Sequence, residues 1–441
     1  MAQIQSDTPE IERYLQDLER VVVSAGGSVL DTARIVAENG EFRVEGPPPR
    51  ATDKFLFEVA EDIMPAPMDY EIVLQGDDLV MNGLVMNGPV LNGPDLNGPV
   101  LNALVLDGNR REVSDAQTQC MELLLALYNL TGKAAHQKRI CPWVLLAEHT
   151  EVLETLFEAR SSDIKLAKLN ALFLEGRQDE LLIESFLSSR WLVLPGDSAR
   201  PDTAVVMPFI DLLNHHSAAT GYMSQIGSDG QRQVVTANAQ PLAKTESDTS
   251  TQTDENSNEC FVYYNRMDRF DSMLHYGFID GSTSFVRSIP MKLELRPGVE
   301  LVIHASTGGM TYKKPPEKEV IFLETLMPEI LSGSDSHVEV SFICVPGPAE
   351  RDALRVILGS LIQLTGMEPN TVAFADAVLR SEAEVVTHNL SYLRRLKVAV
   401  FTLPNEGDVG AYRSELLRLI AIQSTMLNSY AQHFNLSTST P

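Results

Sequence analysis

The sequence predicts an α+β fold: a β-rich core of short strands, interrupted by a helical insert and followed by an all-α C-terminal domain. Three observations lead to it. Residues 28–60 and 203–304 contain short alternating or continuous apolar segments, which is the pattern of strands. Residues 114–190 and about 349–434 carry broad apolar stripes at helical spacing. With 441 residues, 44% of them hydrophobic, the chain can bury two or three cores.

The helices are predicted from apolar stripes and end signals. Residues 8–24 place Ile11, Leu15 and Leu18 on one face, and Gly26-Gly27 ends the stripe. A second helix is expected to start at a capping box formed by Ser114 and Gln117 and to stop at Gly132. A short helix in DSMLHYGFI should run into Gly277.

The strands are shorter and less regular. KFLFEVAEDI alternates and points Phe55, Phe57 and Val59 to one face. AVVMPFIDLL, residues 204–213, is a buried apolar run, and CFVYY and VEVSFICV also resemble strands. Two polar stretches are expected to be connections: a loop at 243–259 and the acidic connector LSGSDSH at 331–337.

A five-residue repeat occupies residues 79–108: LVMNG, LVMNG, PVLNG, PDLNG, PVLNA and LVLDG. One interpretation is a short β-solenoid with its central Met and Leu side chains pointing inward. The other is a duplicated surface insertion in which each Asn-Gly pair makes a turn. Because six units stack into few coils, the second interpretation is favoured, and we assign the repeat no chemistry.

These features divide the chain into five predicted parts. They are an N-terminal helix with the first part of the core, the repeat insertion, a helical insert, the rest of the core with its functional motifs, and a helical domain that binds substrate. The corresponding residues are 1–78, 79–108, 109–190, 191–330 and 331–441.

The net charge of the chain indicates which kinds of molecule it can bind. The formal charge is −25 and the pI is about 4.7. Nucleic acid is therefore not an expected partner, because binding it requires lysines and arginines that neutralise phosphates. An acidic surface favours solubility and would attract a basic patch on a protein substrate.

The sequence also predicts a cytoplasmic protein that does not enter a membrane. The N-terminus lacks the basic and apolar regions of a signal peptide, and no apolar run approaches the length of a membrane span. The four cysteines are scattered and form no CxxC pair, which fits reduced thiols and argues against a zinc cluster. No metal site is predicted.

The stretch PFIDLLNHHSAATGY, residues 208–222, carries the first functional motif. An apolar run ends on Asn214, His215 and His216. Adjacent histidines on a strand point to opposite faces and rarely share one metal ion. A hydrolase would need a nucleophile elbow, and none is recognisable. The remaining interpretations are hydrogen bonding of a small molecule by the Asn and His side chains, or a structural Asn turn.

A second segment, ECFVYYNRMDRFDSMLHYGFID at 259–280, changes this balance. Together with Asp211, Asn214 and His215, its Tyr264 and the Gly277-Phe278 that follows resemble SET-domain protein methyltransferases. The most similar type is that of the Rubisco large-subunit lysine methyltransferase, which also includes an actin histidine methyltransferase. The split core, helical insert and helical C-terminal domain agree with that plan.

The resemblance implies S-adenosyl-L-methionine as cofactor and a protein substrate, with lysine as the methylated residue. Asn214 and His215 would bind the cofactor, and Tyr264 would line the channel where the substrate meets the methyl group. The other cofactor-side positions are Arg190, which matches an upstream Arg of the family, and Asp211, Tyr276, Gly40 and Phe42.

Several of these positions keep a structural alternative. Asp211 could be a structural acid, Arg190 a helix-end cation and Tyr276 a core aromatic. The sequence departs from the family in its early loop, where Gly40-Glu41-Phe42 replaces Gly-x-Gly, and at Asn265 and Arg269. Two rival functions follow: a SET scaffold that binds a protein without catalysis, and a protein-histidine methyltransferase.

Overall fold

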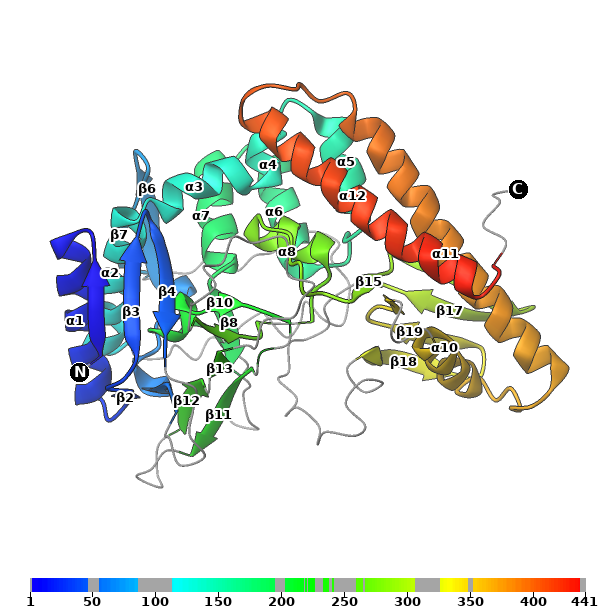
Figure 1. Cartoon of the computed structure of the whole chain (residues 1–441), viewed down its shortest axis with the longest axis horizontal. Helices are drawn as coiled ribbons and strands as arrows, with labels where there is room; N and C mark the ends of the chain where they lie inside the picture. The colour runs from blue at the N-terminus through cyan, green and yellow to red at the C-terminus, as the bar shows by residue number, and fades with distance from the viewer. Residues whose placement is uncertain are drawn as a thin grey trace. The chain divides into compact units, whose positions relative to one another are not determined.

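The computed structural model describes residues 2–46, 55–85, 113–194, 203–217, 219, 221–226, 233–237, 240–241, 259–264, 266–305, 326–347 and 352–436. The chain divides into two compact units (Figure 1). Unit 1 comprises Met1–Lys138, Asp179–Asn265 and Met310–Lys314. Unit 2 comprises Arg139–Gln178, Arg266–Gly309 and Pro315–Pro441. The short strands in small sheets and the helical C-terminal region confirm the α+β class.

The described residues of unit 1 form five small sheets. In order of pairing they are β1 (Gln3–Ser6), β3 (Arg34–Glu38) and β4 (Glu41–Glu45); β11 (Tyr222–Ile226), β12 (Gln233–Ala237), β5 (Phe57–Ala60) and β2 (Ser28–Val29); β6 (Tyr70–Gln75) and β7 (Asp78–Leu84); β8 (Trp191–Leu194) and β9 (Thr203–Val206); β10 (Asn214–His215), β14 (Cys260–Val262) and β13 (Gln240–Pro241). The 3₁₀ turns are η1 (Glu61–Ile63), η2 (Pro67–Asp69) and η4 (Ile210–Leu212).

The helices of unit 1 cover these sheets with the stripes predicted from the sequence. They are α1 (Pro9–Ser24), α2 (Asp115–Leu130), most of α3 (Lys133–Ile140) and α7 (Gln178–Ser188). Leu15 and Leu18 of α1 and Leu124 of α2 are fully buried in one core. The capping box of α2 is confirmed: the Ser114 hydroxyl accepts from the Gln117 N–H at 3.1 Å, and the Gln117 side chain accepts from the Ser114 N–H at 3.0 Å.

Unit 2 combines a four-stranded sheet and a two-stranded sheet with helices. The first pairs β16 (Met291–Arg296), β17 (Val299–Ile303), β19 (His337–Val340) and β18 (Ile330–Ser334), and the second pairs β15 (Phe285–Arg287) and β20 (Cys344–Pro346). The helices are α4 (Pro142–Leu145), α5 (Thr150–Glu158), α6 (Ile164–Leu174), α8 (Arg269–Tyr276), α10 (Ala353–Gln363), α11 (Val372–Val400) and α12 (Gly407–His433). The long α11 and α12 lie side by side (Figure 1).

Three segments differ from the sequence prediction or extend beyond it. The predicted connector at 331–337 is wrong: most of it forms β18 and the turn into β19. The apolar run at 204–213 is not one strand, because β9 ends at Val206, Phe209 adopts a positive φ of 63° and η4 follows. The first repeat unit lies in β7. The repeats from residue 86 onward and the polar loop up to residue 258 lie outside the described residues.

The two-unit division cuts through the predicted helical insert. Helices α2 and α7 belong to unit 1, whereas α4, α5 and α6 belong to unit 2. The five sequence boundaries remain predictions.

Candidate functional site

The first predicted motif lies next to the second because two very short strands pair. β10 runs parallel to β14, with Asn214 opposite Phe261 and His215 opposite Val262. The turn at Phe209 and the 3₁₀ turn that follows redirect the chain from β9 into β10. Since Tyr263 and Tyr264 directly follow β14, this register brings both tyrosines beside His215.

His215 and Tyr264 are joined by backbone and ring contacts. The imidazole Nδ1 of His215 accepts a hydrogen bond from the Tyr264 N–H at 3.1 Å. The ring of Tyr264 lies 5.2 Å from that of His215, and the ring of Tyr263 lies 5.8 Å from it. The Tyr264 hydroxyl donates to the Leu213 carbonyl at 2.5 Å, so its orientation is fixed by the backbone before β10.

Asn214 connects the paired strands β10 and β14 to the early hairpin, which is formed by β3 and β4. Its amide nitrogen donates to the Phe42 carbonyl at 3.2 Å and to a Glu259 carboxylate oxygen at 2.7 Å. Burial raises the pKa of Glu259, although the Asn214 hydrogen bond opposes that rise. Gly40, at the turn before Phe42, has a φ of +80°, and a Cβ there would lie 2.6 Å from the Thr131 carbonyl oxygen. A glycine is therefore required at this turn.

Asp211 and Arg190 lie next to each other, and Arg190 packs against two aromatic rings. The Tyr128 hydroxyl donates to Asp211 at 2.6 Å, whereas an Arg190 nitrogen lies 3.8 Å from the same oxygen. The Arg190 guanidinium also lies 5.6 Å from the Tyr128 ring and 5.5 Å from the Phe186 ring. Burial raises the pKa of Asp211, despite the opposing effects of Arg190 and the Tyr128 hydrogen bond.

Lys133 is a member of this group that the sequence did not single out. Its ammonium lies 2.8 Å from Glu41 and 5.7 Å from the centroid of the Phe42 ring. Burial lowers its pKa, and the positive charge of Arg190 lowers it further. Within KAAHQKRI a lysine has the pattern of a solvated helix surface, so no sequence signal marked it. Tyr128 and Glu259 were missed as well.

Tyr276, the remaining predicted position, belongs to unit 2. It is the last residue of α8, and its ring lies 6.1 Å from the His275 ring and 6.0 Å from the Phe278 ring. The helix ends as predicted at Gly277, which has a φ of +75°. Arg269, at the start of α8, donates to the Gly281 carbonyl at 3.0 Å. Seven of the eight predicted positions thus lie in unit 1.

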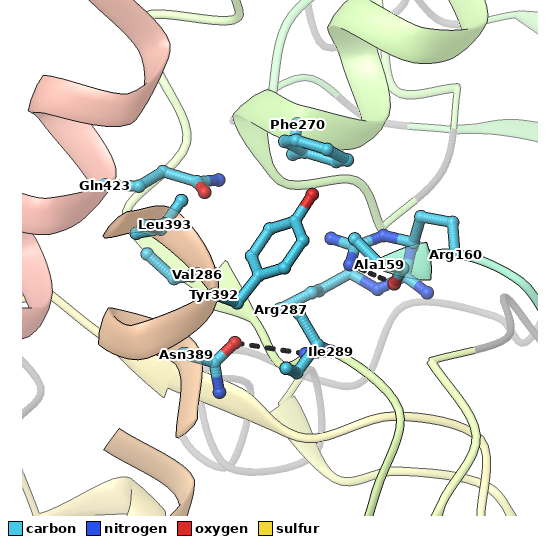
Figure 2. A pocket seen from close by; sticks show the side chains of 10 residues that line it. All are labelled: Ala159, Arg160, Phe270, Val286, Arg287, Ile289, Asn389, Tyr392, Leu393 and Gln423. Carbon is cyan, nitrogen blue, oxygen red and sulfur yellow. Dashed lines mark hydrogen bonds between the residues drawn. The ribbon is translucent and has the colours of Figure 1, made fainter. Parts of the chain in front are cut away.

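A small cavity in unit 2 is lined by apolar and polar side chains, among them Arg160, Arg287 and Asn389 (Figure 2). Its volume is about 10 Å³, on the order of one water molecule, so it has no room for a cofactor or a substrate side chain. Arg160 and Arg287 both bind the buried Asp271, at 2.5 and 2.6 Å, and Asn389 accepts from the Ile289 N–H at 3.0 Å. These contacts are those of a structural polar network.

Two negative findings concern the described residues only. None of their helices combines the length and apolar character that crossing a membrane requires. They also contain no group of three His, Cys, Asp or Glu side chains arranged to hold a metal ion.

Comparison with known proteins identifies no family for this chain. The sequence matches no protein-family model and no curated protein. One solved structure that resembles the chain is described as "Crystal structure of the SET domain of LSMT bound to Lysine and AdoHcy". The likeness has a TM-score of 0.38 and 12% identity, over 96% of this chain and 91% of that chain.

Proposed function

We propose that this chain is an S-adenosylmethionine-dependent protein methyltransferase of the SET type, which transfers a methyl group to a lysine side chain of a protein. The observation that supports this most is the convergence of Asn214, His215 and Tyr264 with the early hairpin at Phe42. The family resemblance implies that these four positions meet at one site, although the sequence separates Phe42 from Asn214 by 172 residues.

The donor set fits an amino-acid-like cofactor. The cofactor would be held by Asn214 and His215 together with the Gly40–Phe42 turn. Arg190 offers a further group: its Nε is buried and has no hydrogen-bond partner among the described residues. Buried donors are almost always satisfied in folded proteins, so an unmatched one beside a proposed site suggests a bound ligand. When bound, the cofactor supplies a methyl group already activated by a sulfonium.

The acceptor must be a neutral amine. A lysine in water has a pKa near about 10.4 and must lose a proton before its nitrogen can attack. An apolar environment disfavours the ammonium and lowers that pKa. Burial lowers the pKa of Lys133, in unit 1, by the same physical cause. The Tyr264 oxygen, held by its bond to Leu213, keeps lone pairs that can accept from the amine and orient it.

The protein substrate is proposed from charge. A net charge of −25 would attract a basic patch around the target residue. The helices α10, α11 and α12 form the region that the resemblance assigns to substrate binding, and we propose that role for them.

The rival function, a protein-binding scaffold without catalysis, is favoured by one specific observation. The amide nitrogen of Asn214 already donates to Phe42 and to Glu259. A cofactor that needs this amide would have to replace one of those bonds. Arg269, which stands in place of the family's Asn, also favours the scaffold function.

Calorimetric titration with S-adenosylmethionine separates the two functions. A methyltransferase should bind it with a measurable heat, whereas a scaffold should show none at about 1 mM ligand. Incubation of a protein extract with methyl-labelled cofactor, followed by mass spectrometry, should then place the label on lysine. Label on histidine would assign the activity to the histidine methyltransferases. If the chain neither binds the cofactor nor transfers the label, the scaffold function is the one that stands.

A further inference from the structure

Strand β18 is an edge strand of the four-stranded sheet in unit 2. The sheet has the order β16-β17-β19-β18, so β18 pairs with β19 on one side and with no described strand on the other (Figure 1). All five residues of Ile330–Ser334 are exposed. Along such an edge, part of the backbone N–H and C=O groups point away from the sheet, where they can pair with a strand of another chain.

The other edge of the same sheet is protected against such pairing. Strand β16 carries Lys292, Glu294 and Arg296, and charged side chains on an edge strand discourage the addition of a further strand. Helix α11 also contacts β16 and binds its backbone, because Arg380 donates to the Leu295 carbonyl at 2.8 Å.

β18 has little of this protection. Its sequence, ILSGS, contains no charged residue and no proline, and the side chains of Ile330 and Leu331 are 48% and 36% exposed. A register shift between Ile330 and Ser332 interrupts the pairing with β19, but Ser332, Gly333 and Ser334 pair regularly after it. The strand is therefore extended, apolar at one end and open to a partner.

Two acidic residues flank β18. Glu329 comes directly before the strand and Asp335 directly after it, and both side chains are exposed. Neither has an ion-pair partner among the described residues. The sequence between residues 326 and 347 contains no lysine and no arginine. The charge at this edge is thus complementary to a strand with basic side chains.

The spacing of the two acids describes the partner more closely. Glu329 and Asp335 are six positions apart, which corresponds to about 20 Å along an extended chain. We infer that β18 binds an extended segment of a partner protein, which carries a lysine or arginine at each end of about five uncharged residues and adds to the sheet as a further strand. The inference does not rest on the proposed function, because this binding needs neither a cofactor nor methyl transfer.

A designed heptapeptide is the probe: lysine at both ends of Val-Thr-Val-Thr-Val, with a fluorescent label. Fluorescence anisotropy measures its affinity for the full-length chain. We expect a dissociation constant of about 10–100 µM that rises with added salt, because salt screens exposed charges. The same peptide with glutamate at both ends should bind at least about tenfold more weakly.

Charge reversal on the protein gives the matched test. Glu329→Lys and Asp335→Lys change exposed side chains and should leave the fold intact, and each should weaken binding of the lysine peptide about fivefold. Glu294→Lys is the control, since this exposed acid lies on β16 at the opposite edge of the sheet. It should leave the affinity unchanged.

Hydrogen exchange locates the contact. The lysine peptide should slow exchange of the Ile330–Ser334 amides at least about threefold, and a proline at its centre should abolish both the slowing and the binding. The absence of binding, unchanged exchange in β18, or equal losses from Glu294→Lys and Glu329→Lys would overturn the inference. Self-association of the chain that excludes the peptide would assign the edge to a second copy and overturn it as well. None of these outcomes bears on the proposed methyl transfer.

Discussion

The side chain of Asn214 donates to the backbone carbonyl of Phe42 at 3.2 Å, across 172 residues of sequence. This bond joins the parallel pair β10 and β14 to the hairpin of β3 and β4. The hairpin carries Gly40 and Glu41 as well as Phe42, so one amide connects most of the proposed cofactor residues.

Replacing Asn214 with leucine should therefore weaken both the fold and the binding of the cofactor. The variant loses the bonds to Phe42 and Glu259, which should lower the free energy of unfolding by about 1–2 kcal/mol. Affinity for S-adenosylmethionine should fall at least about tenfold, as measured by calorimetry. Asn129→Leu is the control: it also removes two side-chain bonds, both to the backbone of Leu79, at 2.9 and 3.0 Å, and should leave affinity unchanged.

Tyr264→Phe should act on transfer and not on cofactor binding. The hydroxyl that it removes is the group we expect to orient the amine, so the rate of methyl transfer should fall about 100-fold. Affinity for S-adenosylmethionine should change less than about threefold. Tyr263→Phe, on the neighbouring ring beside His215, should keep most of the rate. Equal losses in the two variants would mean that both rings only support the fold.

Gly40→Ala should disturb the site through the backbone. A Cβ at this positive φ would lie 2.6 Å from the Thr131 carbonyl oxygen, so the turn before Phe42 must move. We expect a loss of about 2–4 kcal/mol in unfolding free energy, together with weaker cofactor binding. Gly76→Ala is the matched control, with a φ of +70° and nothing within 4 Å of the added carbon. It should lose only about 1 kcal/mol and bind normally; a similar binding loss there would refute the steric explanation.

Acid stability of unit 2 should depend on Asp163. Burial alone would raise the pKa of this carboxyl, but His275 and the Leu166 N–H outweigh it and lower the pKa to about 2. A lowered folded-state pKa stabilises the fold above the unfolded value of 3.8, and this contribution is lost as pH falls toward 2. The stability difference between wild type and Asp163→Asn should thus shrink by about 2 kcal/mol over that window.

Denaturant unfolding at a series of pH values measures this difference. Glu158→Gln, in an exposed pair with Arg395 of the same unit, should show little pH dependence of that kind. A constant difference for Asp163→Asn across the window would contradict the assignment.

From the sequence, some residues of the site could be identified and others could not. Asn214, His215 and Tyr264 were identifiable because each directly follows an apolar run and together they match a family spacing. Lys133, Tyr128 and Glu259 were not, because their roles arise from neighbours far along the chain. Tyr128 lies among the buried apolar residues of α2, although its hydroxyl binds Asp211 across 83 residues.

By itself the sequence determined the α+β class, the helices α1, α2 and α8 and the ends of α2 and α8. Apolar period, capping residues and glycines at positive φ act over a few residues, so they can be read directly from the chain. The tertiary structure alone decided that β18 pairs with β19, that Phe209 breaks the apolar run and that Asn214 bonds to Phe42. Those outcomes depend on pairing, burial and charge between distant segments, and no short window of sequence contains them.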